Sequence, residues 1–396
     1  MRTVYLDNNA TTPLHPEVKE AMIRAMELYG NASSMHSPGQ DAYRAIEDAR
    51  AKLATFIGSS PDEIIFTGSG SEANNTVLNS VYCEKITCSE GKCGSGDCCK
   101  NHLITSVIEH PSILQTAKCY ERRGFEVTYV PVDRYGIIDP EAVRKAIKHN
   151  TGLISIMYAN NEIGTIQPIK EIAAIAKENN IYFHTDGVQA LGKIRFNVRD
   201  LGVDFMSFSG HKIYAPKGVG VLYSRKNTRL CPLIYGGHHE RNRRAGTENT
   251  IGIIALGKAI EIANREMDDN NRRYLKMKQK LRDGLTARIP HIRFNGHPEK
   301  ALPNTLNVTF EYVEGESILL YADFEGISFS TGSACSTGSL DPSHVILALG
   351  VDAEIAHGSI RFSFGMNNTD EDVDYVLEKL PPVIERLRVM SPLYKS

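Results

Sequence analysis

The chain has 396 residues, of which 41% are hydrophobic and 23% charged, and its net charge is −2. This length can bury a large core and predicts two domains, while the near-neutral charge gives no reason to expect binding to nucleic acid or to a membrane. The first residues, MRTVYLDNNATT, lack the basic flank and apolar run of a secretory signal, and no apolar segment reaches the roughly 20 residues of a membrane span. We therefore expect a cytoplasmic protein with reduced thiols.

Short β-branched runs alternate with helical patterns between about residues 60 and 225. The expected strands are 63–68, 102–108, 126–132, 152–159, 181–186, 204–209 and 218–224. Between them, 139–148 and 169–179 carry apolar residues at helical spacing. This alternation, with strands that are apolar almost throughout, predicts an α/β fold with a mostly parallel sheet covered by helices on both faces. Ligands bind such sheets beyond the carboxyl ends of the strands.

The last third of the chain has a different pattern. Its expected elements are a long helix, two strands and a closing helix, at 251–285, 305–310, 358–364 and 371–389. These elements predict a second, smaller α+β domain. We place the large domain at 15–255, and the small domain at 1–14 together with 256–396.

Two stretches are similar to nucleotide-binding loops but lack a required residue. GSGSEA (68–73) follows a strand and opens a helix, yet no acidic residue ends the next strand about 20 positions on, where a ribose would need one. GVQALGKI (187–194) matches a P-loop except that Ile194 stands where Ser or Thr must bind Mg²⁺. What remains of the first motif is a helix N-terminus suited to one phosphate.

Polar residues follow the carboxyl ends of several expected strands. They are Gly70 and Ser71, then Glu109 and His110, then Asn160, Asn161 and Glu162, then Asp186 and Gln189, and finally Ser209, Gly210, His211 and Lys212. Burial can lower the pKa of a lysine at such a position and make it a Schiff-base nucleophile. A carboxylate one strand away can pair with the ring nitrogen of a cofactor. A phosphate cradle, a lysine and a carboxylate together are what pyridoxal 5'-phosphate (PLP) requires.

Five longer segments, spread in order over almost the whole chain, carry a family resemblance. They are YLDNNATT (5–12), TDGVQALGK (185–193), SFSGHKIYAPKGVGVLY (207–223), ERNRRAGTEN (240–249) and STGSACSTGSLDPSHV (330–345). They resemble the PLP-dependent cysteine desulfurases of the NifS/IscS type, in the long-loop class of the class-V aminotransferase family, and residues 232–249 resemble its NifS-like branch. The resemblance implies a PLP-dependent transferase fold of the aspartate-aminotransferase type and a homodimer.

The resemblance also implies roles for residues at the strand ends. Lys212 would bind PLP covalently and later carry the Cα proton of the substrate. Asp186 would keep the pyridine nitrogen protonated, which makes the ring an electron sink, although a helix N-cap is the alternative for TDGVQ. Gln189 is similar to the residue that contacts the ring hydroxyl. His110 matches the histidine that stacks on the ring and serves as acid or base, although a lone histidine can also be an ordinary hydrogen-bonded residue.

The remaining contacts to cofactor and substrate follow from the same resemblance. The phosphate ligands would be Gly70, Ser71, Ser209 and His211, joined from the partner subunit by Thr247. Asn161 would contact both cofactor and substrate. Arg361 would bind the substrate carboxylate, because the planar fork of an arginine binds both oxygens; a surface ion pair is the alternative. No catalytic role is expected for three nearby arginines, Arg241, Arg243 and Arg244.

Cys335 lies in a stretch rich in Gly and Ser, which predicts a mobile loop at 328–342. An exposed thiol in such a loop can ionise at modest cost and can move between a cofactor and another protein. The resemblance implies that Cys335 takes the sulfur of L-cysteine, leaving L-alanine, and carries it as a persulfide to an iron–sulfur scaffold protein or another acceptor. It also implies that Cys335 can ligate a transient cluster shared with that scaffold.

Residues 83–99, CEKITCSEGKCGSGDCC, lie outside the family pattern and hold Cys83, Cys88, Cys93, Cys98 and Cys99. We predict an insertion between a helix and the next strand. It lacks the C-x₂-C pairs that zinc and iron–sulfur sites favour, so exposed thiols, a sulfur relay and a bound metal all stay open. Two other functions also stay open: another PLP activity on the same fold, such as selenocysteine lyase or aminotransferase, and a metal or cluster carrier centred on this segment.

Overall fold

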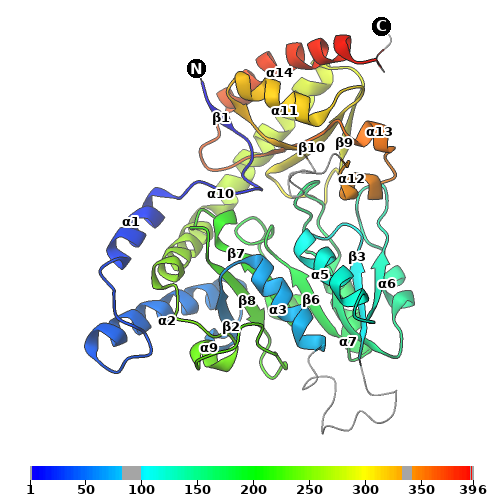
Figure 1. The fold of residues 1–396 in the computed structure, drawn as a ribbon. Coiled ribbons are helices and arrows are strands. Elements are labelled where there is room, and N and C mark those ends of the chain that lie inside the picture. Colours follow the sequence, from blue (N-terminus) through cyan, green and yellow to red (C-terminus); the bar gives the residue numbers. More distant parts are fainter. Residues whose placement is uncertain (1, 83–99, 332–340, 393, 395–396) are drawn as a thin grey trace.

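The computed structural model describes residues 2–82, 100–331, 341–392 and 394. Within these ranges, a seven-stranded sheet forms the centre of the larger half of the molecule (Figure 1). Its strands lie in the order β2 (Ile64–Thr67), β8 (Gly220–Ser224), β7 (Phe205–Ser209), β6 (Tyr182–Asp186), β5 (Thr151–Ser155), β3 (His102–Ser106) and β4 (Glu126–Val130). Here β8 is antiparallel to both of its neighbours and the other pairs are parallel. The seven predicted strands and the mostly parallel sheet are confirmed.

Both faces of this sheet are buried, which explains why its strands are apolar almost throughout. In β2, Ile64 and Phe66 belong to one core cluster and Ile65 to another. In β3, Ile104 and Leu103 divide between the same two clusters. Successive side chains of a strand point to opposite faces, so each cluster fills one side of the sheet.

Helices complete the two clusters. On one face, the core includes residues of α2 (Ser37–Ile57), α7 (Ile169–Glu178) and the first half of α10 (Thr250–Arg288). On the other face, it includes residues of α3 (Gly70–Tyr82) and α5 (Pro111–Glu121). The two helices predicted at 139–148 and 169–179 are confirmed as α6 (Pro140–Ala146) and α7.

The smaller half has its own sheet and core. Its strands lie in the order β12 (Ser330–Thr331), β13 (Ser359–Ser363), β10 (Thr305–Phe310) and β9 (Ile292–Asn295), all antiparallel, and they pack with α11 (Gly315–Phe324), α14 (Asp370–Met390) and the end of α10. The N-terminal β1 (Val4–Tyr5) pairs with β11 (Ile327–Ser328), so the first residues join this half. The α+β pattern predicted for the last third is confirmed.

Several short elements complete the described part of the fold. They are α1 (Pro16–Ala25), η1 (Pro61–Glu63), α8 (Val198–Leu201), η2 (Gly210–Lys212), α9 (His239–Asn242), α12 (His344–Ala348) and α13 (Ala353–Ala356). The predicted insertion at 83–99 and residue Cys335, with most of the loop at 328–342, lie outside the described residues. Among the helices that the structure describes, none combines the length and the apolar character needed to cross a bilayer.

The core under α2 gives a test of this packing. Leu53 is 0% exposed and lies in the core that α2 shares with α10 and the sheet. Leu53→Ala leaves a cavity, so we expect the free energy of unfolding to fall by about 3 kcal/mol. The matched control is Leu320→Ala on α11, where the side chain is 60% exposed and the loss should stay below about 0.5 kcal/mol. Urea titrations of both variants measure the difference, and equal losses would contradict the packing described.

Candidate active site

One cavity of about 240 Å³ lies where the two halves of the molecule meet. It brings together most of the site residues expected from the sequence: Gly70, Ser71, His110, Asn161, Asp186, Gln189, Ser209, His211, Lys212 and Arg361. Thr247 does not line this cavity and is exposed on the surface. Several of these residues follow β3, β6 and β7, and the carboxyl ends of parallel strands meet at one edge of a sheet. This arrangement explains how residues so far apart in the sequence share one cavity.

The N-terminus of α3 forms one end of the cavity, which Ser69, Gly70 and Ser71 line. A Cβ atom on Gly70 would lie 2.7 Å from Val188 Cγ2, so the helix can approach the neighbouring turn this closely because residue 70 is a glycine. Ser69 Oγ accepts the N–H of Glu72 at 3.0 Å and caps the helix. The first N–H groups of a helix have no partner within it. Together with the serine hydroxyls, they suit a phosphate.

Ser209 and His211 complete this end of the cavity from the turn after β7. His211 Nδ1 lies 3.1 Å from Thr11 Oγ1. Burial, helped by the charge of Lys212, lowers the pKa of His211 to about 4. The imidazole is therefore neutral at physiological pH and can take part in hydrogen bonds with an anion only through a ring N–H.

Asp186 ends β6 and faces the cavity with a buried carboxylate. Oδ1 accepts the N–H of Val188 at 2.9 Å. Residues 188–193 form a turn and not a helix, so this contact is not the helix N-cap considered from the sequence. Oδ2 accepts from Asn74 Nδ2 at 2.7 Å. These two hydrogen bonds fix the carboxylate in one orientation, while the residue still lines the cavity. Asn74, on α3, was not expected from the sequence.

His110 is the N-cap of α5 and is held in a fixed tautomer. Its Nδ1 accepts the N–H of Ser112 at 3.1 Å, so a ring proton belongs on Nε2. Burial lowers the pKa of His110, which the charge of Asp186 opposes and that of Lys212 assists. Ser112 Oγ also accepts from Asn74 Nδ2 at 2.9 Å. Asn74 therefore links the histidine side of the cavity to the carboxylate of Asp186.

Lys212, in the turn η2 after β7, reaches the N-terminal segment of the chain. Its Nζ donates to the main-chain oxygens of Asn9, at 2.6 Å, and Ala10, at 2.7 Å. The side chain of Asn9 donates to Thr305 Oγ1 of β10 at 2.8 Å. Asn9 therefore joins the amine, which belongs to the larger half, to a strand of the smaller half. The segment YLDNNATT signalled family membership in the sequence, but the part that Asn9 plays needed the structure.

Lys193 is a second lysine beside the cavity, and unlike Lys212 it is buried. Its Nζ donates to Gln189 Oε1 at 2.7 Å and to Asn9 Oδ1 at 3.1 Å. Burial lowers the pKa of Lys193 well below its usual value, and the charge of Lys212 adds to this effect. Gln189 Nε2 in turn donates to the main-chain oxygen of Asn9 at 3.1 Å. The lysine that completed the rejected P-loop pattern thus orients Gln189.

Arg361 enters the cavity from β13 of the smaller half. It forms an ion pair with Asp7, with 2.7 Å between Nη2 and Oδ1, and its Nη1 donates to the main-chain oxygen of Asn161 at 3.1 Å. Its Nε has no hydrogen-bond partner among the described residues. The side chain is buried, so the surface ion pair considered for Arg361 from the sequence is wrong. A buried guanidinium at a cavity wall can bind a carboxylate through two bonds.

Glu109, next to His110, is buried without lining the cavity. Its Oε1 accepts from Ser106 Oγ at 2.5 Å and from the N–H of Met157 at 3.0 Å. Its Oε2 has no hydrogen-bond partner among the described residues. Burial raises the pKa of Glu109 to about 8, against the effect of these two hydrogen bonds. The carboxyl group is therefore largely protonated near neutral pH.

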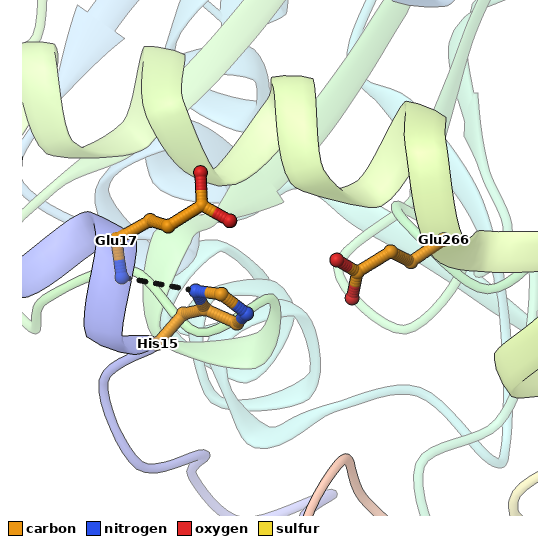
Figure 2. A group of neighbouring side chains, drawn as sticks. All are labelled: His15, Glu17 and Glu266. Carbon is orange, nitrogen blue, oxygen red and sulfur yellow. Dashed lines mark hydrogen bonds between the residues drawn. The ribbon is translucent and has the colours of Figure 1, made fainter.

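Outside the cavity, one cluster has the residue types of a metal site. Potential ligand atoms of His15, Glu17 and Glu266 lie within 4.8 Å of one another (Figure 2). However, the Glu17 carboxylate is paired with Arg265 at 2.5 Å and Lys258 at 3.1 Å, and His15 Nδ1 accepts the N–H of Glu17 at 3.2 Å. These contacts explain why the three side chains lie together: they belong to the ion pairs and the helix cap at the N-terminus of α1, and no metal ion is needed to hold them.

The donor set of the cavity fits PLP. The N-terminus of α3, which approaches the neighbouring turn closely at Gly70, suits the phosphate. The fixed carboxylate of Asp186 suits a protonated ring nitrogen, and the amine of Lys212 can attach the cofactor. The guanidinium of Arg361 can bind the carboxylate of an amino acid. Fold and site together define a PLP-dependent enzyme acting on an amino acid.

Comparison with known proteins specifies the family. Residues 4–376 match the family Aminotransferase class-V. The chain is 51% identical over 393 residues to "Cysteine desulfurase IscS" of Methanosarcina thermophila, covering 99% of this chain and 94% of that protein. It is 52% identical over 396 residues to the protein of the same name from Dictyoglomus turgidum, covering 100% of this chain and 98% of that one.

Solved structures agree with the sequence relatives. A "NIFS-LIKE PROTEIN" superposes with a TM-score of 0.89 at 40% identity, covering 98% of this chain and 100% of that chain. A NifS-like protein from Rickettsia africae does so with a TM-score of 0.86 at 32% identity, covering 97% and 100%. The chain belongs to the cysteine desulfurases of the class-V aminotransferase family, which use PLP, and the expected fold class is confirmed.

The buried Glu109 predicts a pH dependence of stability. Its pKa is about 8 in the folded state against a usual 4.5, so the folded state keeps a proton that the unfolded state has released. The free energy of unfolding should therefore fall as the pH rises between about 4.5 and 8. Glu109→Gln removes this group and should flatten the slope by up to about 1.4 kcal/mol per pH unit. Urea titrations across this range measure it, with Glu316→Gln, an exposed residue, as the matched control; an unchanged slope in Glu109→Gln would contradict the assignment.

Proposed function

We propose that this chain removes sulfur from L-cysteine in the cavity, releases L-alanine, and carries the sulfur as a persulfide on Cys335 to an iron–sulfur scaffold protein or another acceptor. The observation that carries the proposal is the meeting of Lys212, Asp186, Arg361 and the N-terminus of α3 in one cavity. Relatives named cysteine desulfurase that match the chain over its whole length support it. They favour this reaction over an aminotransferase, a selenocysteine lyase or a metal carrier.

The cavity residues would hold PLP through contacts at each end of the ring. Gly70, Ser71, Ser209 and His211 would bind the phosphate, with Thr247 added from a second chain. Asp186 would keep the ring nitrogen protonated, and Gln189 would contact the ring hydroxyl. When bound, PLP supplies an electron sink that stabilises negative charge at the substrate Cα. Lys212 would hold the cofactor covalently.

Four side chains would handle the substrate itself. Arg361 would bind its carboxylate, next to Asn161, whose main-chain oxygen already fixes the guanidinium. Lys212 would take the Cα proton and return it to the product, since two main-chain oxygens hold its Nζ at the cavity wall. His110 would stack over the ring and serve as acid or base through Nε2, because Nδ1 is occupied by the N–H of Ser112.

Cys335 would complete the reaction as the sulfur carrier. Its thiolate attacks the sulfur of the substrate, so that a sulfur–sulfur bond forms while the Cβ–sulfur bond breaks. The electron pair of the broken bond stays with the carbon fragment, which takes up a proton and leaves as L-alanine. The Gly- and Ser-rich sequence around Cys335 suits this travel between the cavity and an acceptor protein.

A homodimer is part of the proposal. Apolar side chains crowd the surface at and after α1, where Tyr29 is 85% and Met35 is 95% exposed, and Tyr235 is 74% exposed ahead of Thr247. Large exposed apolar side chains of this kind are typical of interfaces. A second chain would cover them and would receive Thr247, which lies outside the cavity of its own chain.

Replacing the proposed sulfur carrier tests the reaction. Cys335→Ala should keep the absorbance of bound PLP yet form no L-alanine from L-cysteine above background, because no thiolate accepts the sulfur. The matched control is Cys119→Ala, which removes a free thiol on α5 and should leave turnover unchanged. L-alanine is measured by mass spectrometry under anaerobic conditions. Normal turnover in Cys335→Ala, or turnover confined to selenocysteine in the unaltered protein, would overturn the proposal.

The mass of the assembly tests the dimer. Light scattering should give twice the mass of one chain for the unaltered protein. A double variant, Tyr29→Asp with Met35→Asp, should shift the assembly towards the monomer, because burying a carboxylate costs more than the apolar contact it replaces. The control is Phe324→Asp on α11, where the side chain is 73% exposed; this variant should keep the mass of the unaltered protein. A monomer for the unaltered protein would contradict the proposal.

A further inference from the structure

The segment from Glu240 to Thr247 begins with an unusual backbone conformation. Glu240, Arg241 and Asn242 have φ values of 47°, 57° and 64°. Each of these non-glycine residues in the left-handed region costs on the order of 1–3 kcal/mol, and such residues normally occur singly rather than in succession. Other contacts must therefore hold the segment in place.

A buried ion pair provides the first of these contacts. The Glu240 carboxylate accepts two bonds from Arg50 of α2, Nη1 to Oε2 and Nη2 to Oε1, both at 2.8 Å. Oε2 also accepts the N–H of Phe66 in β2 at 3.0 Å, and Arg50 donates to the main-chain oxygen of Ile64 at 2.9 Å. Both charged side chains are buried. Removing one partner of such a pair leaves an uncompensated buried charge, so the pair fixes the segment to the sheet edge.

A second ion pair ties the other end of the turn. Arg244 Nε lies 2.9 Å from Glu72 Oε1, and Glu72 Oε2 accepts the N–H of Gly68 at 2.8 Å. Glu72 belongs to the first turn of α3, whose N-terminus lines the cavity. The segment is thus fixed relative to its own chain at Glu240, the first of the three strained residues, and at Arg244, two positions after the last.

The segment ends at Thr247, which is not part of the chain's own cavity. Thr247 is exposed and does not line the cavity. It lies two positions before Asn249, the N-cap of α10, whose Oδ1 accepts the N–H of Gly252 at 3.0 Å. Thr247 therefore makes no contribution to the cavity of its own chain. The exposed Tyr235, which precedes this segment in the sequence, favours contact with another molecule.

We propose that Arg50 and Glu240 are positioning residues that act on a second copy of the chain: they set the segment 240–247 so that Thr247 reaches the phosphate end of that copy's cavity. This inference rests on the proposed function, which places Thr247 in the partner's site. It adds that the PLP affinity of each site depends on an ion pair buried in the other chain.

Hybrid dimers separate this role from ordinary stabilisation. In the first hybrid, one chain carries E240Q and the other carries K212A, so the one site that retains Lys212 receives its segment from a chain with Glu240 intact. In the second hybrid, one chain carries both changes and the other is unaltered, so the site that retains Lys212 receives the altered segment. Two different affinity tags isolate each hybrid. Borohydride reduction followed by peptide mass spectrometry then measures the fraction of Lys212 linked to PLP as the PLP concentration is varied.

We expect the second hybrid to need about tenfold more PLP for half occupancy of Lys212 than the first. The matched control is E261Q in both arrangements, since Glu261 pairs with Lys52 and Lys258 on the surface, and its two hybrids should not differ. If E240Q chains fail to assemble, E240D, which keeps the charge and shortens the side chain, replaces them and should give the same order with a smaller ratio.

Two further hybrids, in which T247A takes the place of E240Q in the same two arrangements, distinguish the outcomes. A difference between the two T247A hybrids without one between the E240Q hybrids would overturn the positioning role and leave the proposed function standing. Equal PLP occupancy of Lys212 in the two T247A hybrids would overturn the placement of Thr247 in the partner's site, and the positioning role with it. Equal PLP occupancy in the two E240Q hybrids, or a higher PLP requirement in the first than in the second, would also overturn the positioning role.

Discussion

The contact on which the site depends is the pair of hydrogen bonds from Lys212 Nζ to the main-chain oxygens of Asn9 and Ala10. Lys212 follows the central sheet, whereas Asn9 is bound through its side chain to Thr305 of the smaller half and to Lys193 of the larger one. A cavity between two separately packed halves keeps its shape only if they are joined, and one of the joints lies at the Lys212 amine, as another lies between Arg361 and Asn161. The role proposed for Lys212 requires its amine to be held in a fixed position in this way.

Burial sets the charges around that amine. Asp186, Lys193 and Arg361 are all buried: Asp186 accepts a hydrogen bond from Asn74, Lys193 donates one to Gln189, and Arg361 is paired with Asp7. Burial also lowers the pKa of His110 and His211, so both imidazoles are neutral. Polar groups that are already oriented lose little energy to reorganisation when charge moves during a reaction.

The sequence predicted the sheet because strands buried on both faces are apolar throughout, and it predicted most cavity residues because they follow strand ends. It could not show the supporting contacts. Asn74 meets Asp186 across 112 positions of sequence, and neither residue signals the other by spacing. Lys193 first drew attention as part of a P-loop pattern, and its contact with Gln189 emerges only from the fold. The burial of Arg361 likewise depends on pairing between β13 and β10.

The central claim is that sulfur leaves L-cysteine and is held on Cys335. The most direct measurement is a single anaerobic turnover with isotopically labelled L-cysteine, followed by alkylation and peptide mass spectrometry. We expect one labelled sulfur atom added to the peptide that contains Cys335, with an equal amount of L-alanine formed. Labelled sulfur on the cysteines of 83–99 but none on Cys335 would contradict this role of Cys335. L-alanine formed without any protein-bound sulfur would contradict it as well.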